Sequence, residues 1–176
     1  MPRRSGLLTL TLAPLAAADP QEVEALLDAA FGGDRHKRTA YRLREGTAAI
    51  PHLSVAAFAD GALVGSLQSW PVELASLRGR APLVLVGPVA VAPERQQGGI
   101  GRALMAHMLA AADAGATPPL VMIGDPEYYG RFFGFSAEAT QGWDVPGPVE
   151  RRRLLARGGP LPADGMLGPR RAAIAA

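Results

Sequence analysis

The pattern of apolar and polar positions at the start of the chain predicts a strand followed by two helices. Thr9–Leu12 alternates between polar and apolar residues, as a half-buried strand does. Asp19-Pro20 is a typical helix start, and apolar residues then recur at helical spacing until Gly32-Gly33. A second helical pattern covers Arg35 to Arg44. The basic face of that segment is either a substrate wall or a solvated surface.

The middle of the chain predicts a hairpin and then a buried strand. Two extended runs, 53–59 and 62–70, flank Asp60-Gly61, which is typical of two-residue hairpin turns. Residues 74–82 are expected to form a loop, or a loop with ragged strand ends. The run 83–91 is almost entirely apolar, as expected for a central strand that is covered on both faces.

A strand–helix–strand unit follows from this central strand. The next segment has apolar residues on one helical face and ends near Gly115. The residues on that face are Leu104, Met105, Met108, Leu109 and Ala112. Leu120–Ile123 then reads as a short buried strand, so it is expected to lie parallel to 83–91 with a right-handed crossover.

The last third of the chain gives weaker patterns. Asp125-Pro126 begins another short helix, residues 133–137 return as a strand, and a further strand is expected around 149–155. Residues 158–176, rich in Gly, Pro and Ala, are expected to be the least ordered. The chain therefore predicts a single α/β domain over 1–176, with a core of 7–157 built on a mixed sheet flanked by helices.

Composition narrows the classes of function. The chain has 176 residues, 48% apolar and 19% charged, which is enough for a globular core. Without cysteine there is no disulfide framework, thiolate metal site or cysteine nucleophile, and a reducing, cytoplasmic location is the simplest expectation. The net charge is only +2 and the arginines are scattered apart from Arg151–Arg153, so no nucleic-acid partner is expected.

The N-terminus allows two interpretations. Arg3-Arg4, the apolar run from Gly6 and the alanines at 16–18 imitate a secretory signal. Pro14 interrupts that run, however, and the alternation in Thr9–Leu12 suits a first strand equally well. No apolar run is long enough to cross a bilayer, so no membrane partner is expected.

The most informative feature is a glycine-dense turn between the central strand and the next helix. Gly98, Gly99 and Gly101 remove side chains where the backbone turns and can approach a ligand. The first helical amides lack internal partners, and with the helix dipole they favour an anion such as a pyrophosphate. A Walker loop would need Lys-Ser or Lys-Thr where Arg102 and its neighbour stand, and a dinucleotide fingerprint would need glycine at Leu104.

Two segments resemble the GCN5-related N-acetyltransferase (GNAT) family. Gln96-x-x-Gly99-x-Gly101, preceded by Val-x-Val-x-Pro, is similar to the family's acetyl-CoA-binding motif. The pair Tyr128-Tyr129, followed by Gly134-Phe135, is similar to its aromatic pair and Gly-Phe. The spacing after the pair is one residue longer than the commoner family form, and Gln97-Gly98 stands where many relatives have glycine and then a basic residue.

The resemblance implies a GNAT-like acyl-CoA N-acyltransferase fold and direct transfer of an acetyl group from acetyl-CoA to a primary amine of a small molecule or a protein. It implies a phenol, Tyr129 or alternatively Tyr128, that gives a proton to the departing thiolate. Gly87-Pro88 is expected to open the strand so that the pantetheine arm pairs with its main chain. The cofactor-binding residues implied are Val89, Val91, Gln96, Gln97, Gly98, Gly99, Ile100, Gly101 and Arg102.

Some features stay open at this stage. No general base is identified, because the candidate groups lie outside any motif and a water chain is an alternative. These candidates are Glu73, Glu94, His36, His52 and His107. No metal site is expected. A homodimer is a possible assembly, and the alternative function is a catalytically weak or inactive CoA-binding regulatory protein.

Overall fold

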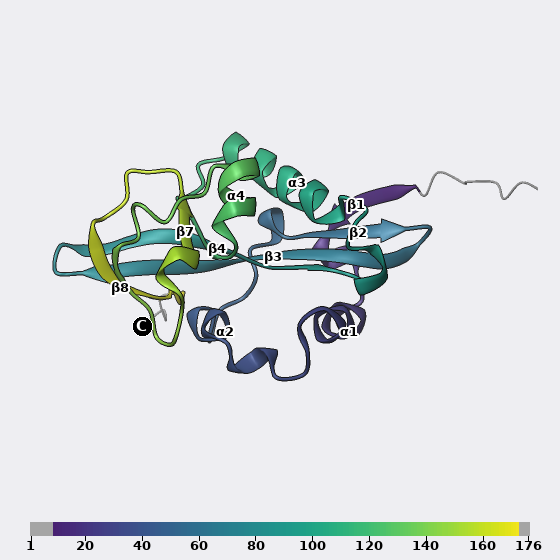
Figure 1. Cartoon of the computed structure of the whole chain (residues 1–176), viewed down its shortest axis with the longest axis horizontal. Helices are drawn as coiled ribbons and strands as arrows, with labels where there is room; N and C mark the ends of the chain where they lie inside the picture. The colour runs from purple at the N-terminus through teal and green to yellow at the C-terminus, as the bar shows by residue number, and fades with distance from the viewer. Residues whose placement is uncertain (1–8, 173–176) are drawn as a thin grey trace, which may run out of the picture.

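The computed structural model describes residues 9–172, which form an eight-stranded mixed sheet with helices on both faces (Figure 1). The strands are β1 (Leu10–Pro14), β2 (Val55–Ala59), β3 (Ala62–Ser76), β4 (Gly79–Val91), β5 (Leu120–Ile123), β6 (Gly142–Asp144), β7 (Leu154–Arg157) and β8 (Asp164–Pro169). The helices are α1 (Pro20–Phe31), α2 (Thr39–Leu43), α3 (Ile100–Ala114) and α4 (Pro126–Phe133). In Figure 1, α1 and α2 lie on one side of the sheet and α3 and α4 on the other. The predicted mixed α/β architecture is confirmed.

The sheet is built around β3 and β4. Its order is β1-β2-β3-β4-β5-β7, and β8 pairs with the far half of β3, with β6 beside it. Apolar side chains from α1 and α3 and the inner strands form one core, and a second core gathers around the buried Trp143 near β8. The sheet therefore has two hydrophobic cores, and β4 contributes side chains to both.

The N-terminal alternation forms a strand, as predicted. β1 pairs antiparallel with β2, and a 3-10 turn over Leu15–Ala17 follows it. Arg3-Arg4 and the run 6–8 of the signal-like stretch lie outside the described residues, as do residues 173–176. In the part of the chain from 9 to 172, no helix combines the length and apolarity that a bilayer crossing requires.

Local signals predicted two helix starts and one hairpin correctly. The Asp19 carboxylate accepts a hydrogen bond from Gln21 N at 2.8 Å, and Asp125 accepts one from Glu127 N at 3.1 Å. These bonds satisfy N–H groups that a helix leaves unpaired at its start. Asp60 and its glycine both have positive φ, as the tight turn between β2 and β3 requires.

The expected loop over residues 74–82 is wrong, because β3 and β4 form one long hairpin. β3 continues to Ser76 and β4 begins at Gly79. The apolar residues of this region are buried against Leu167 of β8, a partner that lies far away in sequence. Pro82 fits in β4 because pairing with β5 begins only at Val84, so the missing N–H faces no neighbouring strand.

Four further expectations are corrected. The helix predicted over 35–44 divides into a 3-10 turn, Arg35–Lys37, and α2, because Arg38 between them is extended. Residues 133–137 make only an isolated bridge, Ser136 to Ala156, and the strand expected around 149–155 is β7 at 154–157. The tail contains β8, which forms an ordered part of the sheet.

The predicted bulge and the predicted parallel pair are both present in β4. Register passes from Leu67 opposite Val89 to Ser69 opposite Val86, so one residue of β3 faces Gly87-Pro88. β4 runs parallel to β5, but the pairing covers only Val84 and Leu85. Beyond Leu85 the two strands separate, and this opens the edge of β4.

Gly65 of β3 allows α3 to pack closely on the sheet. A Cβ at this position would lie 2.8 Å from Ile100 Cγ2 and 3.0 Å from Leu104 Cδ1. Ile100 is the first residue of α3, so this contact fixes where the glycine turn ends.

Replacing Gly65 with alanine is expected to lower the free energy of unfolding by about 1–3 kcal/mol, because the new methyl group overpacks the contact with α3. Urea denaturation followed by circular dichroism measures the change. Gly168→Ala is the matched control, since it also lies in a strand but has no atom within 4 Å of its Cβ position. Equal destabilisation by both variants would contradict the proposed packing role.

Candidate functional site

The glycine turn joins the end of β4 to the start of α3. Pro93–Arg95 forms one 3-10 turn, and Gln96 then has helical backbone angles. Gly99 is the N-cap of α3 and has a φ of 74°, in the left-handed region that glycine adopts without strain. Apart from its chain neighbours, no described atom lies within 4 Å of a Cβ position on Gly99, so this side of the turn is open.

Between Gln97 and Arg102, five N–H groups have no main-chain acceptor within residues 9–172. They belong to Gln97, Gly99, Ile100, Gly101 and Arg102. The next N–H, that of Ala103, begins the helical ladder by donating to the Gly99 carbonyl at 3.0 Å. Unpaired N–H groups at the positive end of a helix dipole form an anion-binding site. The turn is therefore built to hold a phosphate group.

The open edge of β4 carries further unpaired main-chain groups. Ala92 N donates to Val64 O at 2.8 Å, which fixes the hydrogen-bond alternation with β3. Bonded and non-bonded positions alternate in an antiparallel pair, so Val91 and Val89 direct their N–H and C=O groups away from β3. These groups face the gap that opens where β4 leaves β5.

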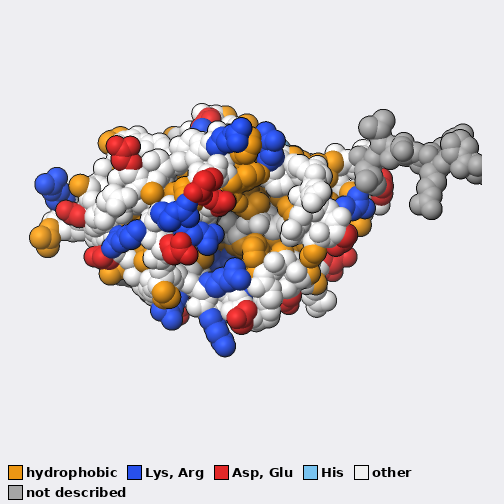
Figure 2. Space-filling view, in the orientation of Figure 1, with side chains coloured by type: hydrophobic (Ala, Val, Ile, Leu, Met, Phe, Trp, Pro, Cys, Tyr) orange, Lys and Arg blue, Asp and Glu red, His pale blue; other side chains and the backbone are white. Residues whose placement is uncertain are grey.

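A cleft of about 1090 Å³ lies beside this gap. Its walls are segment 31–44, the bulged part of β4, the junction of β5 with α4, and loop 148–153. Figure 2 shows an apolar hollow on this face with basic side chains gathered beside it. Val89 and Tyr129 both line the cleft, so the open edge of β4 and one tyrosine of the aromatic pair belong to one site.

A family model for the acetyltransferase (GNAT) domain matches residues 11–137. The match includes the glycine turn and the aromatic pair Tyr128-Tyr129. The chain belongs to the GNAT family. A search of curated protein sequences finds no match.

Solved structures share the fold of this GNAT domain. The GNAT family N-acetyltransferase YhbS from Escherichia coli, solved in complex with CoA, is 21% identical with a TM-score of 0.71, covering 94% of this chain and 92% of its own. A Brucella melitensis GNAT acetyltransferase in complex with acetyl-CoA is 24% identical with a TM-score of 0.61, covering 92% and 96%. Arabidopsis thaliana Naa50, bound to the bisubstrate analogue CoA-Ac-MVNAL, is 16% identical with a TM-score of 0.53, covering 86% and 100%. The predicted GNAT-like fold is confirmed.

The two tyrosines of the GNAT domain differ in environment. Tyr129 lines the cleft, whereas Tyr128 is not part of its lining and packs edge-on against Tyr129 and Phe132. Burial raises the pKa of Tyr129 to about 12, and neighbouring Tyr128 adds to the rise. The phenol of Tyr129 therefore keeps its proton at neutral pH.

Gly124, at the end of β5, leaves room for the Tyr129 ring. A Cβ on Gly124 would lie 2.7 Å from two ring carbons of Tyr129. The ring thus rests directly on the backbone that leads into α4, which fixes its direction toward the cleft.

The side chains of the glycine turn point to different surroundings. Ile100 is buried in the core, so only its main chain faces the open side. Arg102 stacks on the ring of Phe132, with its guanidinium carbon 4.3 Å from the ring centre, which ties α3 to α4. Gln96 and Gln97 are exposed. The N–H of Gly98 donates to Arg95 O at 3.1 Å, so Gly98 helps to shape the turn.

None of the five residues considered as general bases lines the cleft. Glu73, for example, pairs with Arg80 on the β3–β4 hairpin. The carboxylates that do line it are Asp34, Asp125 and Glu150. Across residues 9–172, no group of three or more metal-ligating side chains is placed to hold a metal ion.

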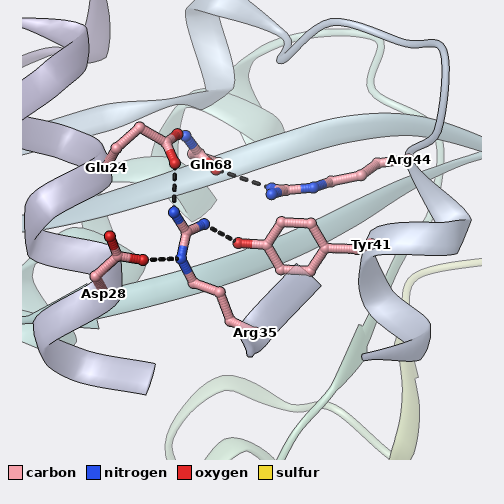
Figure 3. Close-up of polar contacts among 6 residues, drawn as sticks. All are labelled: Glu24, Asp28, Arg35, Tyr41, Arg44 and Gln68. Atoms are coloured by element: carbon pink, nitrogen blue, oxygen red, sulfur yellow. Dashed lines mark hydrogen bonds and ion pairs between the residues drawn. The ribbon is translucent and has the colours of Figure 1, made fainter. Parts of the chain in front are cut away.

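The segment before α2 is held by a buried arginine (Figure 3). Arg35, 2% exposed, donates to Asp28 Oδ1 at 2.9 Å and also to Glu24 and the Tyr41 hydroxyl. Burial alone would lower the pKa of Arg35, but these three hydrogen bonds offset that effect and raise it. Arg35 is therefore a fixed, charge-compensated anchor between α1 and α2.

Arg44 is the second arginine of this wall, and its importance was not evident from the sequence. Its Nη1 donates to Gln68 Oε1 at 2.9 Å, and its guanidinium stacks on Tyr41 and Trp70. The basic face of 35–44 was the only sequence signal for this wall. Arg44 and Gln68 are 24 positions apart, so no short stretch of sequence indicates the contact between them.

The arginine run at 151–153 has its own partners within the fold. Arg151 donates to the carbonyl of Trp143, and Arg152 pairs with Glu127 of α4. Arg153 lines the cleft.

A phenolate absorbance titration is expected to show one tyrosine ionising near pH 12, about two units above an ordinary phenol, because the buried site disfavours the charged form. Tyr129→Phe should remove this component, whereas Tyr128→Phe should leave it. If Tyr129→Phe instead removes a component that ionises at the pH of an ordinary phenol, the phenol of Tyr129 is not desolvated.

Proposed function

We propose that the chain is an N-acetyltransferase that moves an acetyl group from acetyl-CoA to a primary amine of a small molecule or a protein. The observation that carries this proposal is the set of five unpaired N–H groups on the open side of the glycine turn. Such a set fits a diphosphate, which offers several oxygen acceptors and negative charge. The CoA and acetyl-CoA complexes of the E. coli and B. melitensis relatives support the same ligand here.

The glycine turn and the open edge of β4 would bind different parts of CoA. The N–H groups from Gln97 to Arg102, excluding Gly98, would hold the diphosphate, and the Gln96 side chain lies at the edge of the same turn. The outward N–H and C=O groups of Val89 and Val91 would pair with the amides of the pantetheine arm. Acetyl-CoA supplies an acetyl group activated as a thioester.

The chain's own groups around the open edge of β4 suit acyl transfer. An N–H at Val89 or Val91 can donate to a carbonyl oxygen on which negative charge develops. The neutral phenol of Tyr129 lines the same cleft and can give its proton to a departing thiolate. The cleft between this edge and segment 31–44 has room for the amine.

Gly99→Glu is expected to lower the affinity for acetyl-CoA by at least about a hundredfold, because a bulky carboxylate would stand among the phosphate-binding N–H groups. Isothermal titration calorimetry measures the dissociation constant.

Gly61→Glu is the matched control for this substitution. Gly61 also has a positive φ, 83°, with no atom within 4 Å of its Cβ position, but it lies in the β2–β3 turn. The affinity of Gly61→Glu for acetyl-CoA should match that of the wild type. If Gly99→Glu still binds acetyl-CoA tightly, the glycine turn is not part of the cofactor site.

Tyr129→Phe is expected to reduce kcat by about 10²–10⁴-fold while the acetyl-CoA dissociation constant changes little, because only the proton donor is lost. Thiol release in the presence of an amine panel, alongside calorimetry, separates the two effects. Tyr128→Phe provides the comparison, since Tyr128 does not line the cleft. An unchanged rate in Tyr129→Phe would assign proton donation to Tyr128 or to solvent.

A further inference from the structure

The charges of the cleft are unbalanced toward the basic side. Its lining contains five basic side chains and three acidic ones. The basic ones are Arg35, Lys37, Arg38, Arg44 and Arg153, and the acidic ones are Asp34, Asp125 and Glu150. Arg35 is compensated by Glu24 and Asp28, which lie outside the lining. With Arg35 set aside, four basic side chains remain against three acidic ones, so a ligand in the cleft meets a small excess of positive charge.

Among the four remaining cations, Arg44 is half-buried, whereas Lys37, Arg38 and Arg153 are exposed to water. No carboxylate oxygen of residues 9–172 lies within 4 Å of the Arg44 guanidinium, although ion pairs of that length compensate Arg35 nearby. Its polar contact is with the neutral amide of Gln68, and its guanidinium lies over the ring of Tyr41 (Figure 3). The guanidinium also stacks on the ring of Trp70. Burial lowers the pKa of Arg44, which reflects the cost of keeping this charge away from water.

The contacts of Arg44 also hold it in one direction. Tyr41 is fixed by the hydrogen bond from Arg35, so the surface on which Arg44 stacks is rigid. Gln68 is the β3 residue that faces Gly87-Pro88, where β4 bulges. The guanidinium is therefore placed beside the opened edge of β4, near the point where transfer would occur.

We propose that Arg44 binds an anionic group of the acceptor, so that the substrate is a small amine that also carries a carboxylate or a phosphate. This inference rests on the proposed acetyl transfer. A guanidinium offers a planar set of donors that matches either anion, and a partly desolvated one gains most from such a partner. Arg44 and the β4 bulge line the same cleft, which favours an anion and an amine within one small molecule.

Matched pairs of amines test the proposal by initial rates of acetylation. The pairs are γ-aminobutyrate with butylamine, and phosphoethanolamine with ethanolamine, and they distinguish a carboxylate from a phosphate. The wild type is expected to prefer the anionic member of at least one pair by about tenfold or more in kcat/KM, the effect of one charge-assisted hydrogen bond. Arg44→Gln should bring that ratio close to one while rates with the neutral amines change little.

Two further variants separate recognition from structure. Lys37→Gln removes an equal charge from the same wall and should keep most of the preference for the anionic amine. Arg44→Lys keeps the charge without the planar fork and should restore part of it. A purely structural role for Arg44 would lower the rates for both members of a pair equally, and this outcome would overturn the proposal.

Calorimetry of the same amines, with free and with CoA-saturated protein, gives a readout that does not need turnover. The wild type should bind the preferred anion more tightly than its neutral partner, and Arg44→Gln should lose that difference without losing affinity for CoA. If no amine is acetylated but this difference remains, the acetyl transfer fails and the anion site stands. Equal affinities, or weaker CoA binding by Arg44→Gln, would overturn the anion site and leave the proposed function intact.

Discussion

A strand edge that loses its neighbour inside a folded protein leaves N–H and C=O groups in need of partners, because buried main-chain groups are almost always hydrogen-bonded. The edge of β4 beyond Leu85 is such an edge. β4 bulges at Gly87-Pro88, just after its pairing with β5 ends, while the other edge stays paired with β3 through Val91. The sheet thus stays continuous on one side of β4 and exposes polar main chain on the other.

The glycine turn depends on the same strand. β4 leads into the turn, and α3 returns over the sheet because Gly65 allows its first residues to approach β3. The unpaired N–H groups of the turn therefore come directly after the open edge of β4 in the chain. Main-chain groups held by strand and helix geometry need no side-chain rotamers to be ordered, which suits the recognition of an extended ligand.

The opposite wall of the cleft is organised by side chains instead. Arg35 is almost fully buried, and removing one carboxylate partner from such a charge is strongly destabilising. Its bonds to α1 and to Tyr41 fix the direction of the segment before α2. That rigidity lets Arg44 sit without a carboxylate close to the β4 bulge, an arrangement that a flexible loop would not keep.

Features encoded by neighbouring residues could be predicted from the sequence. The caps at Asp19 and Asp125, the turn at Asp60-Gly61 and the glycine turn each depend on a few adjacent residues and their backbone preferences. β8 could not be predicted, because a strand in a Gly- and Pro-rich tail is stabilised by pairing with β3 about ninety residues earlier. The Arg44–Gln68 contact could not be predicted either, because its two residues also lie far apart in the sequence.

This difference in encoding separates the two halves of the candidate site. The cofactor half uses main-chain groups and glycines, so a short motif identifies it even where relatives are about one-fifth identical. The acceptor half is assembled from α1, α2, β3 and loop 148–153, whose side chains meet only after folding. Substitutions at Arg44 or Gln68 would alter that half without disturbing the glycine turn. A fold shared with relatives of known cofactor therefore carries little information about the acceptor, and the charge balance of the cleft is the more direct guide.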